Sequence, residues 1–143
     1  MASIHRSALV EYSSEQMFDL INDIEKYPEF MQGCREAVVI SQNEVELVGR
    51  LCLSKAGIKQ EFTTRNALDR PHSIDMELVE GKFKNFSSRW TFVKLADNAC
   101  KVSLRMDFEF DIGLVDFAAE KLLSASANSL VDSLVSRAKQ VYR

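Results

Sequence analysis

The C-terminal stretch Leu114–Tyr142, LVDFAAEKLLSASANSLVDSLVSRAKQVY, contains neither glycine nor proline and decides how the rest of the chain is organised. Its apolar residues recur at helical spacing, which predicts one helix roughly 40 Å long at about 1.5 Å per residue. Small residues occupy its middle, from Ser124 to Ser129, and indicate either close packing on a sheet or one wall of a pocket. The expected apolar face comprises Val115, Ala119, Leu122, Leu123, Leu130, Leu134 and Val141.

The region before this helix alternates apolar and polar residues between short turns. The clearest run is Cys100–Phe110, in which every second residue is apolar and all the residues between are polar. Such alternation predicts antiparallel strands with one dry face and one wet face, and the short turns favour a meander. The other expected strands are Ile4–Tyr12, Ala37–Ile40, Val45–Ser54, Ile58–Leu68, Ile74–Val79 and Phe86–Phe92.

Two short helices are expected between the first two strands. Ser13 and Gln16 match a capping box, which predicts a helix start at Ser13. Pro28 suits the first turn of a second helix, since its missing N–H has no helical partner there, and Gly33 would end that helix. The order is therefore β-α-α-β-β-β-β-β-β-α, an α+β fold of about seven antiparallel strands. A curved sheet that grips the last helix leaves a cavity between sheet and helix.

Composition narrows the class of protein. A chain of 143 residues is expected to form one domain over residues 1–143. The formal charge of −3 and the pI of about 5.4 argue against a general electrostatic grip on nucleic acid, and no DNA partner is expected. No apolar run approaches the ~20 residues of a membrane span, and the N-terminus lacks a signal-peptide core, which favours the cytoplasm. Cys34, Cys52 and Cys100 are widely spaced and are expected to be reduced, buried thiols.

No strong catalytic motif is present, and we expect no catalytic residues, no metal and no required cofactor. His5 falls on a predicted strand and His72 on a predicted turn, so neither is favoured as a base. Asp107, Glu109 and Asp111 share one strand face, where paired carboxylates could bind a cation or transfer protons. The favoured interpretation is the solvated side of an outer strand.

The alternate strand residues that are predicted to face the last helix define a candidate ligand site. Ligand pockets are mostly apolar and contain a few polar groups. On several strands the residues that are predicted to face inward include aromatic side chains, with a few polar side chains among them. The same residues could equally form a filled core. The candidate ligand-binding residues are Phe62, Thr64, Asn66, Phe86, Trp90, Phe108, Leu122 and Ser126.

Two groups of basic residues could contact phosphates or anionic headgroups. Lys82 and Lys84 surround the Gly81 turn, while Arg137 and Lys139 lie near the end of the last helix. Together the two groups could form one patch, although ordinary solvated charge is the favoured interpretation for any single residue.

Short motifs along essentially the whole chain carry a family resemblance. They are Ala8-Leu9-Val10-x-Tyr12-Ser13, Gln16-Met17-Phe18, Tyr27-Pro28-x-Phe30, Gly33-Cys34, Ser54-Lys55-Ala56-Gly57-Ile58, Phe62-Thr63-Thr64-Arg65-Asn66, Gly81-x-Phe83-Lys84, Trp90-x-Phe92 and Asp107-Phe108-Glu109-Phe110. With these motifs the chain resembles the coenzyme Q-binding, polyketide cyclase-like family of the START superfamily, and within it the bacterial ribosome association toxins.

The resemblance implies a helix-grip (START/Bet v1-like) fold with a hydrophobic tunnel. It implies, first, non-enzymatic binding of ubiquinone, another isoprenoid or a lipid in support of respiration, with contact at the periphery of the inner membrane as one option. The alternative is a toxin that binds the large ribosomal subunit and blocks its joining to the small one. An enzyme of the cyclase or hydrolase type is the third hypothesis.

Overall fold

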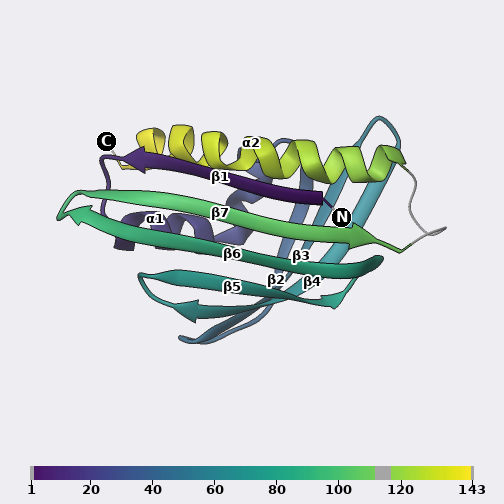
Figure 1. Cartoon of the computed structure of the whole chain (residues 1–143), viewed down its shortest axis with the longest axis horizontal. Coiled ribbons are helices and arrows are strands. Elements are labelled where there is room, and N and C mark those ends of the chain that lie inside the picture. Colours follow the sequence, from purple (N-terminus) through teal and green to yellow (C-terminus); the bar gives the residue numbers. More distant parts are fainter. Residues whose placement is uncertain (1, 112–116, 143) are drawn as a thin grey trace.

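Seven antiparallel strands form one sheet in the order β1-β7-β6-β5-β4-β3-β2 in the computed structural model, which describes residues 2–111 and 117–142 (Figure 1). Strands β2 to β7 form the expected meander. The first strand, β1, pairs with the last strand, β7, so β1 and β2 occupy opposite edges of the sheet. The strands are β1 (Ala2–Val10), β2 (Cys34–Gln42), β3 (Glu46–Lys55), β4 (Ile58–Asp69), β5 (Ser73–Glu80), β6 (Phe83–Ala96) and β7 (Ala99–Phe110).

The long helix α2 (Phe117–Val141) lies beside β1 and covers the dry face of the sheet (Figure 1). Arg6 holds the two elements together, because it donates to the Asn128 carbonyl at 2.6 Å and pairs with Asp132 at 2.9 Å. These contacts explain why Arg6, a charged residue, occupies one of the β1 positions that otherwise carry inward-facing apolar residues. The curved sheet gripping a C-terminal helix confirms the predicted α+β architecture.

The apolar face of α2 differs from prediction at its end. Val141 is 50% exposed, whereas the buried stripe passes through Leu134 and Ala138. The next position on this stripe is Tyr142, whose ring lies 5.9 Å from that of Tyr12. Ala119, Leu122, Leu123, Leu130 and Leu134 are buried as expected, and Leu114 and Val115 lie outside the described residues.

Helix α1 (Ser14–Asn22) begins as the sequence predicts. Gln16 N–H donates to the Ser13 hydroxyl at 3.1 Å, and Ser13 N–H donates to the Gln16 side chain at 2.9 Å. The second helix is a 3₁₀ turn, η1 (Ile24–Glu29), and the placement of Pro28 in its first turn is wrong. Pro28 lies inside η1 near its end, and the turn continues past it, since Phe30 N–H donates to the Tyr27 carbonyl at 3.1 Å. Gly33 follows with a φ of +82°.

Strand β2 is longer than predicted. It spans Cys34–Gln42, whereas the sequence indicated only Ala37–Ile40. Strand β2 is an edge strand with two register shifts, one between Cys34 and Glu36 and one between Val39 and Ser41. Each shift breaks the apolar–polar alternation on which the prediction depended.

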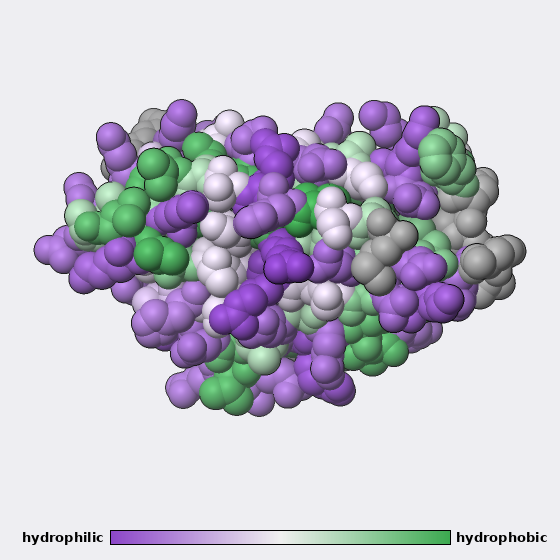
Figure 2. All heavy atoms as spheres, viewed as in Figure 1, coloured by the Kyte–Doolittle hydropathy of each residue, from purple (hydrophilic) through white to green (hydrophobic). Residues whose placement is uncertain are grey.

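The outer face of the sheet carries paired charges. Arg89 of β6 pairs with Asp75 of β5 at 2.7 Å, and Asp107 of β7 accepts hydrogen bonds from Ser3 and Arg105. The hydrogen bond from Ser3 lowers the pKa of the Asp107 carboxyl. Polar residues dominate this face over β1, β7, β6 and β5, with small apolar patches between them (Figure 2). The β7 carboxylates therefore belong to the solvated face, as the sequence favoured.

Candidate functional site

A narrow cavity of about 50 Å³ lies between the sheet and α2. Helix α1, η1, five strands and α2 all contribute to its wall. The lining residues are Ile21, Asn22, Ile24, Tyr27, Met31, Gly49, Leu51, Phe62, Thr64, Asn66, Ile74, Met76, Trp90, Leu104, Met106, Leu123, Ala127 and Leu130. A cavity of about 150 Å³ is needed to hold benzene, so this one admits ordered water but no aromatic ring as it stands. The expected tunnel is thus largely filled.

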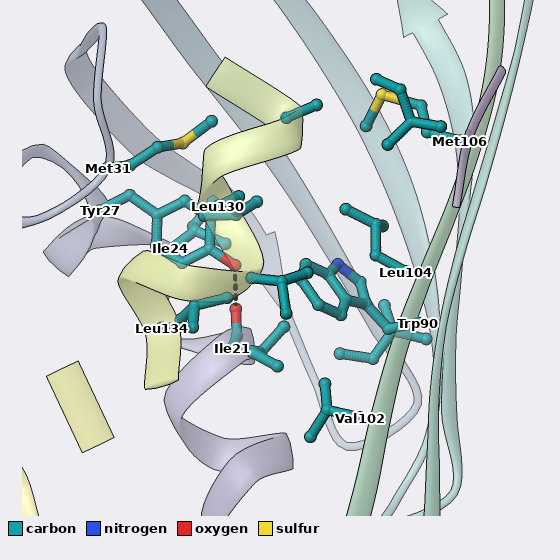
Figure 3. Packing of buried hydrophobic residues seen from close by; sticks show 14 of the residues in the cluster. Ile21, Ile24, Tyr27, Met31, Trp90, Val102, Leu104, Met106, Leu130 and Leu134 are labelled. Atoms are coloured by element: carbon teal, nitrogen blue, oxygen red, sulfur yellow. Dashed lines mark hydrogen bonds between the residues drawn. The ribbon is translucent and has the colours of Figure 1, made fainter. Parts of the chain in front are cut away.

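Side chains from η1 fill the space that would otherwise be a tunnel. Figure 3 shows Tyr27 and Met31 beside Leu130 of α2, facing Trp90 on the sheet across the interior. Gly49 of β3 makes room for this arrangement, because a Cβ atom at that position would come within 2.3 Å of Ile24 Cδ1. The segment between α1 and β2 therefore determines how much cavity remains.

The polar atoms of the cavity fall into two groups. Thr64 donates its hydroxyl proton to Asn66 Oδ1 at 2.8 Å, so these buried residues satisfy each other. At the α1 end, Tyr27 donates its hydroxyl proton to the Ile21 carbonyl at 2.5 Å (Figure 3). Asn22 Oδ1 is buried near this end and has no hydrogen-bond partner within residues 2–111 and 117–142. The α1 end therefore presents acceptor oxygens.

Tyr27 is the one ionisable residue among the cavity-lining residues that the structure describes. Burial raises the pKa of its phenol, and the nearby Cys34 and Asp23 act in the same direction. The phenol is therefore neutral and serves as a hydrogen-bond donor. His5 points to the outer face and His72 lies exposed in the turn after β4. Nothing in this lining supplies an acid–base pair.

Four of the eight candidate ligand-binding residues line the cavity: Phe62, Thr64, Asn66 and Trp90. Phe86 and Phe108 lie instead in an aromatic cluster that fills one end of the grip. Phe83 joins their rings, with centroids 5.2 Å from Phe86 and 6.2 Å from Phe108. That end is solid core, which was the alternative that the sequence left open.

Leu122 and Ser126 do not line the cavity. A Cβ atom on Gly33 would come within 2.7 Å of Ser126 Oγ and 3.4 Å of Leu122 Cδ1. Ser126 therefore allows α2 to approach the Gly33 turn closely. The pocket wall on α2 is formed by Leu123, Ala127 and Leu130, the neighbouring stripe of the helix.

The sequence reasoning missed the contribution of α1 and η1 to the site. Ile21, Asn22, Tyr27 and Met31 all line the cavity, but none of them was among the candidate ligand-binding residues. Phe83 was also missed. A register shift between Phe83 and Asn85 turns Phe83 inward, although its parity opposes that of Phe86.

The two groups of basic residues do not form a single patch. Lys82 lies just before β6, where its carbonyl accepts from Asp111 N–H at 3.1 Å. Lys139 is near the opposite end of the molecule, close to Tyr142, whose hydroxyl donates to the Gln16 carbonyl (Figure 1). The possibility of one patch is therefore excluded, because α2 runs the length of the sheet between the two groups (Figure 1). Arg137 pairs with Glu29 at 2.7 Å.

None of the helices within residues 2–111 and 117–142 combines the length and apolarity that crossing a membrane requires.

Comparison with known proteins places this geometry in context. The family described as polyketide cyclase/dehydrase and lipid transport matches residues 10–135. The ribosome association toxin RatA of Vibrio cholerae serotype O1 is 44% identical over 142 residues, which cover 99% of both chains. The mitochondrial coenzyme Q-binding protein COQ10 of Drosophila melanogaster is 23% identical over 109 residues, 73% of this chain and 45% of that protein. The structure of the Zhui aromatase/cyclase from Streptomyces sp. R1128 superimposes with a TM-score of 0.82 at 18% identity, covering 99% of this chain and 96% of that one. The last comparison confirms the helix-grip fold.

Proposed function

The chain belongs to the polyketide cyclase/dehydrase and lipid transport family, and we propose that within it the chain acts on the ribosome. Specifically, it would bind the large ribosomal subunit in the cytoplasm and block joining of the subunits, which would inhibit translation. The observation that carries this proposal is the 44% identity, over 99% of both chains, to a protein named as a ribosome association toxin.

The interior geometry is consistent with a function exerted by the surface. A cavity of about 50 Å³ is not ready to receive a quinone ring, and its described lining offers no acid–base pair. Ribosome binding makes no demand on this cavity. Because the chain carries a formal charge of −3, docking would depend on local contacts more than on a general attraction to RNA.

Expression in a bacterial host followed by sucrose-gradient centrifugation tests the proposal. We expect the 70S peak to fall and the free-subunit peaks to rise after induction. A matched control is Leu104→Asp, which places a carboxylate in the fully buried interior and prevents folding. Unchanged ribosome profiles with abundant folded wild-type protein would contradict the proposal.

A second candidate function is non-enzymatic binding of a hydrophobic small molecule, such as a quinone or another lipid. It is supported by the apolar cavity with one acceptor-bearing end and by the relative named as a coenzyme Q-binding protein. Native mass spectrometry of gently purified protein tests it directly. A bound mass that organic solvent extracts would support binding, whereas material of unliganded mass only, with no uptake of added quinone, would count against it.

A further inference from the structure

The segment Ile24–Gly33 covers the cavity without taking part in the sheet ladder. Up to Met31 its backbone bonds are local, as in Lys26 N–H to the Asp23 carbonyl at 3.2 Å and Met31 N–H to the Tyr27 carbonyl at 2.7 Å. Its last residue, Gly33, is tied to the sheet, because its carbonyl accepts from Ser54 N–H of β3 at 2.8 Å. The segment nevertheless supplies Ile24, Tyr27 and Met31 to the cavity lining. The part from Ile24 to Met31 can therefore move away, with Gly33 as its fixed end, while every strand pair stays intact.

The segment is fastened to α2 by one surface side chain. Arg137 Nη2 lies 2.7 Å from Glu29 Oε1, and its guanidinium lies 5.3 Å from the centre of the Phe30 ring. Exposed ion pairs and cation–π contacts of this kind are individually weak. The contacts of Arg137 are thus the smaller part of what holds the segment closed, and the burial of Ile24, Tyr27 and Met31 is the larger part.

Tyr27 places a phenol where a ligand would otherwise lie. Its hydroxyl donates to the Ile21 carbonyl, which belongs to the last turn of α1, where carbonyls lack helical partners. Asn22 Oδ1, buried at the same end, receives no hydrogen bond from the residues that the structure describes. Any molecule that replaced the Tyr27 ring would face two acceptors, and leaving buried acceptors unsatisfied is costly.

We propose that Tyr27 is a built-in occupant of the ligand site, and that a small aromatic molecule bearing a hydroxyl group displaces it when the segment Ile24–Gly33 opens as a lid. This inference rests on the second candidate function. The hydroxyl would donate to the Ile21 carbonyl or to Asn22 Oδ1, and the ring would contact Trp90. A ring that carries only acceptors would leave the Ile21 carbonyl unpaired, although the Asn22 amide could turn its NH₂ group towards it.

Trp90 provides the readout, since it is the one tryptophan of the chain and lines the cavity. The indole N–H signal of ¹⁵N-labelled protein would be followed during titration with 4-propylphenol and with its methyl ether, 4-propylanisole. The proteins compared are wild type, Tyr27→Ala, Arg137→Gln and the control Arg6→Gln, which loosens α2 from β1 instead of from the lid.

We expect Arg137→Gln to bind the phenol about 3–10-fold more tightly than wild type, because a larger fraction of the protein is open. Tyr27→Ala should bind more tightly still, Arg6→Gln should match wild type, and the methyl ether should bind about tenfold more weakly throughout. Hydrogen exchange should show faster exchange at Phe30 and Met31 in Arg137→Gln only.

Two outcomes overturn the proposal in different ways. Equal phenol affinity in all four proteins, or equal affinity for phenol and ether, would reject the lid or the donor requirement while leaving ligand binding in place. No binding by Arg137→Gln or by folded Tyr27→Ala, despite faster exchange in the segment, would reject ligand binding in this cavity altogether. Arg137→Gln keeps the test decisive if Tyr27→Ala fails to fold.

Discussion

Gly49 lies directly beneath Ile24, so closely that a Cβ atom on Gly49 would come within 2.3 Å of Ile24 Cδ1. Gly49 is on the sheet and Ile24 is the first residue of η1, and both line the cavity. The absence of a side chain on β3 is therefore what lets the segment between α1 and β2 sit low over the interior. This contact links the sequence of a strand to the volume of the site.

The first prediction concerns this contact. Gly49→Ala should lower the free energy of unfolding by about 1–3 kcal/mol, because the added methyl overpacks the interior. Urea denaturation would measure the loss. Ile24→Val removes the Cδ1 atom that the new methyl meets, so the double variant should lose less than the sum of the two single variants. Strictly additive losses in the free energy of unfolding would show that contact with Ile24 is not the source of the destabilisation.

A second prediction compares two glycines with matching backbones. Gly33 and Gly57 have φ of +82° and +83°, so alanine strains both positions alike. Only Gly33 faces α2, where the new Cβ would meet Ser126 Oγ at 2.7 Å, whereas nothing lies within 4 Å at Gly57. Gly33→Ala should therefore cost about 1–3 kcal/mol more than Gly57→Ala in chemical denaturation.

Ser126→Ala provides the check on that comparison. In its background the extra cost of Gly33→Ala should shrink, since the hydroxyl oxygen that the Cβ approaches is gone. Equal costs for the two glycines in wild type would mean that α2 does not approach the Gly33 turn closely.

The third prediction concerns Cys34. Burial raises the pKa of its thiol from 9.0 to about 11, with Cys52 adding to the rise. In the unfolded chain the thiol ionises near 9, so between pH 9 and 11 the unfolded state binds fewer protons than the native state. This contribution to stability is present below pH 9 and is lost as the pH rises towards 11.

Two measurements check the Cys34 prediction. Native protein should react slowly with iodoacetamide at pH 8, at a rate that rises about tenfold per pH unit, because only the thiolate attacks. Cys34→Ala should flatten the fall in denaturation midpoint between pH 9 and 11. Fast modification of Cys34 at neutral pH, detected by peptide mass spectrometry, would contradict the assignment.

A fourth prediction separates the two basic ends of the molecule. Lys82 and Lys84 are exposed and form no ion pair among the described residues, whereas Arg137 is engaged by Glu29. We predict that Lys82→Glu/Lys84→Glu weakens binding to the large ribosomal subunit about tenfold or more and reduces its salt dependence. Lys139→Glu at the far end is the control and should change little. The reverse order of effects would place the contact at the helix end.

The sequence predicted those parts of the fold that depend on local pattern. Strand β7 was read correctly because Cys100 to Phe110 alternate without interruption and all six inward residues are buried. The start of α1 at Ser13 followed from a capping box that involves only neighbours in the chain. The role of α2 followed from its length and its freedom from glycine and proline.

The rest of the site depends on contacts between distant residues. Phe83 faces inward because of a register shift, which no parity rule anticipates. Ser126 was offered as a pocket wall, but its place is set by Gly33, which lies far away in sequence. Tyr27 looked like part of a turn, and its burial depends on Gly49 leaving space for η1. Half of the candidate ligand residues line the cavity, because alternation predicts which residues face inward but not which of them border an unfilled space.

Co-sedimentation of the purified chain with purified ribosomal subunits tests the central claim most directly. At moderate salt, the account predicts that the folded chain pellets with large subunits in a saturable way, does not pellet with small subunits, and lowers the yield of 70S particles when both are mixed. Protein that stays in the supernatant with large subunits, while circular dichroism shows it to be folded, would contradict ribosome association.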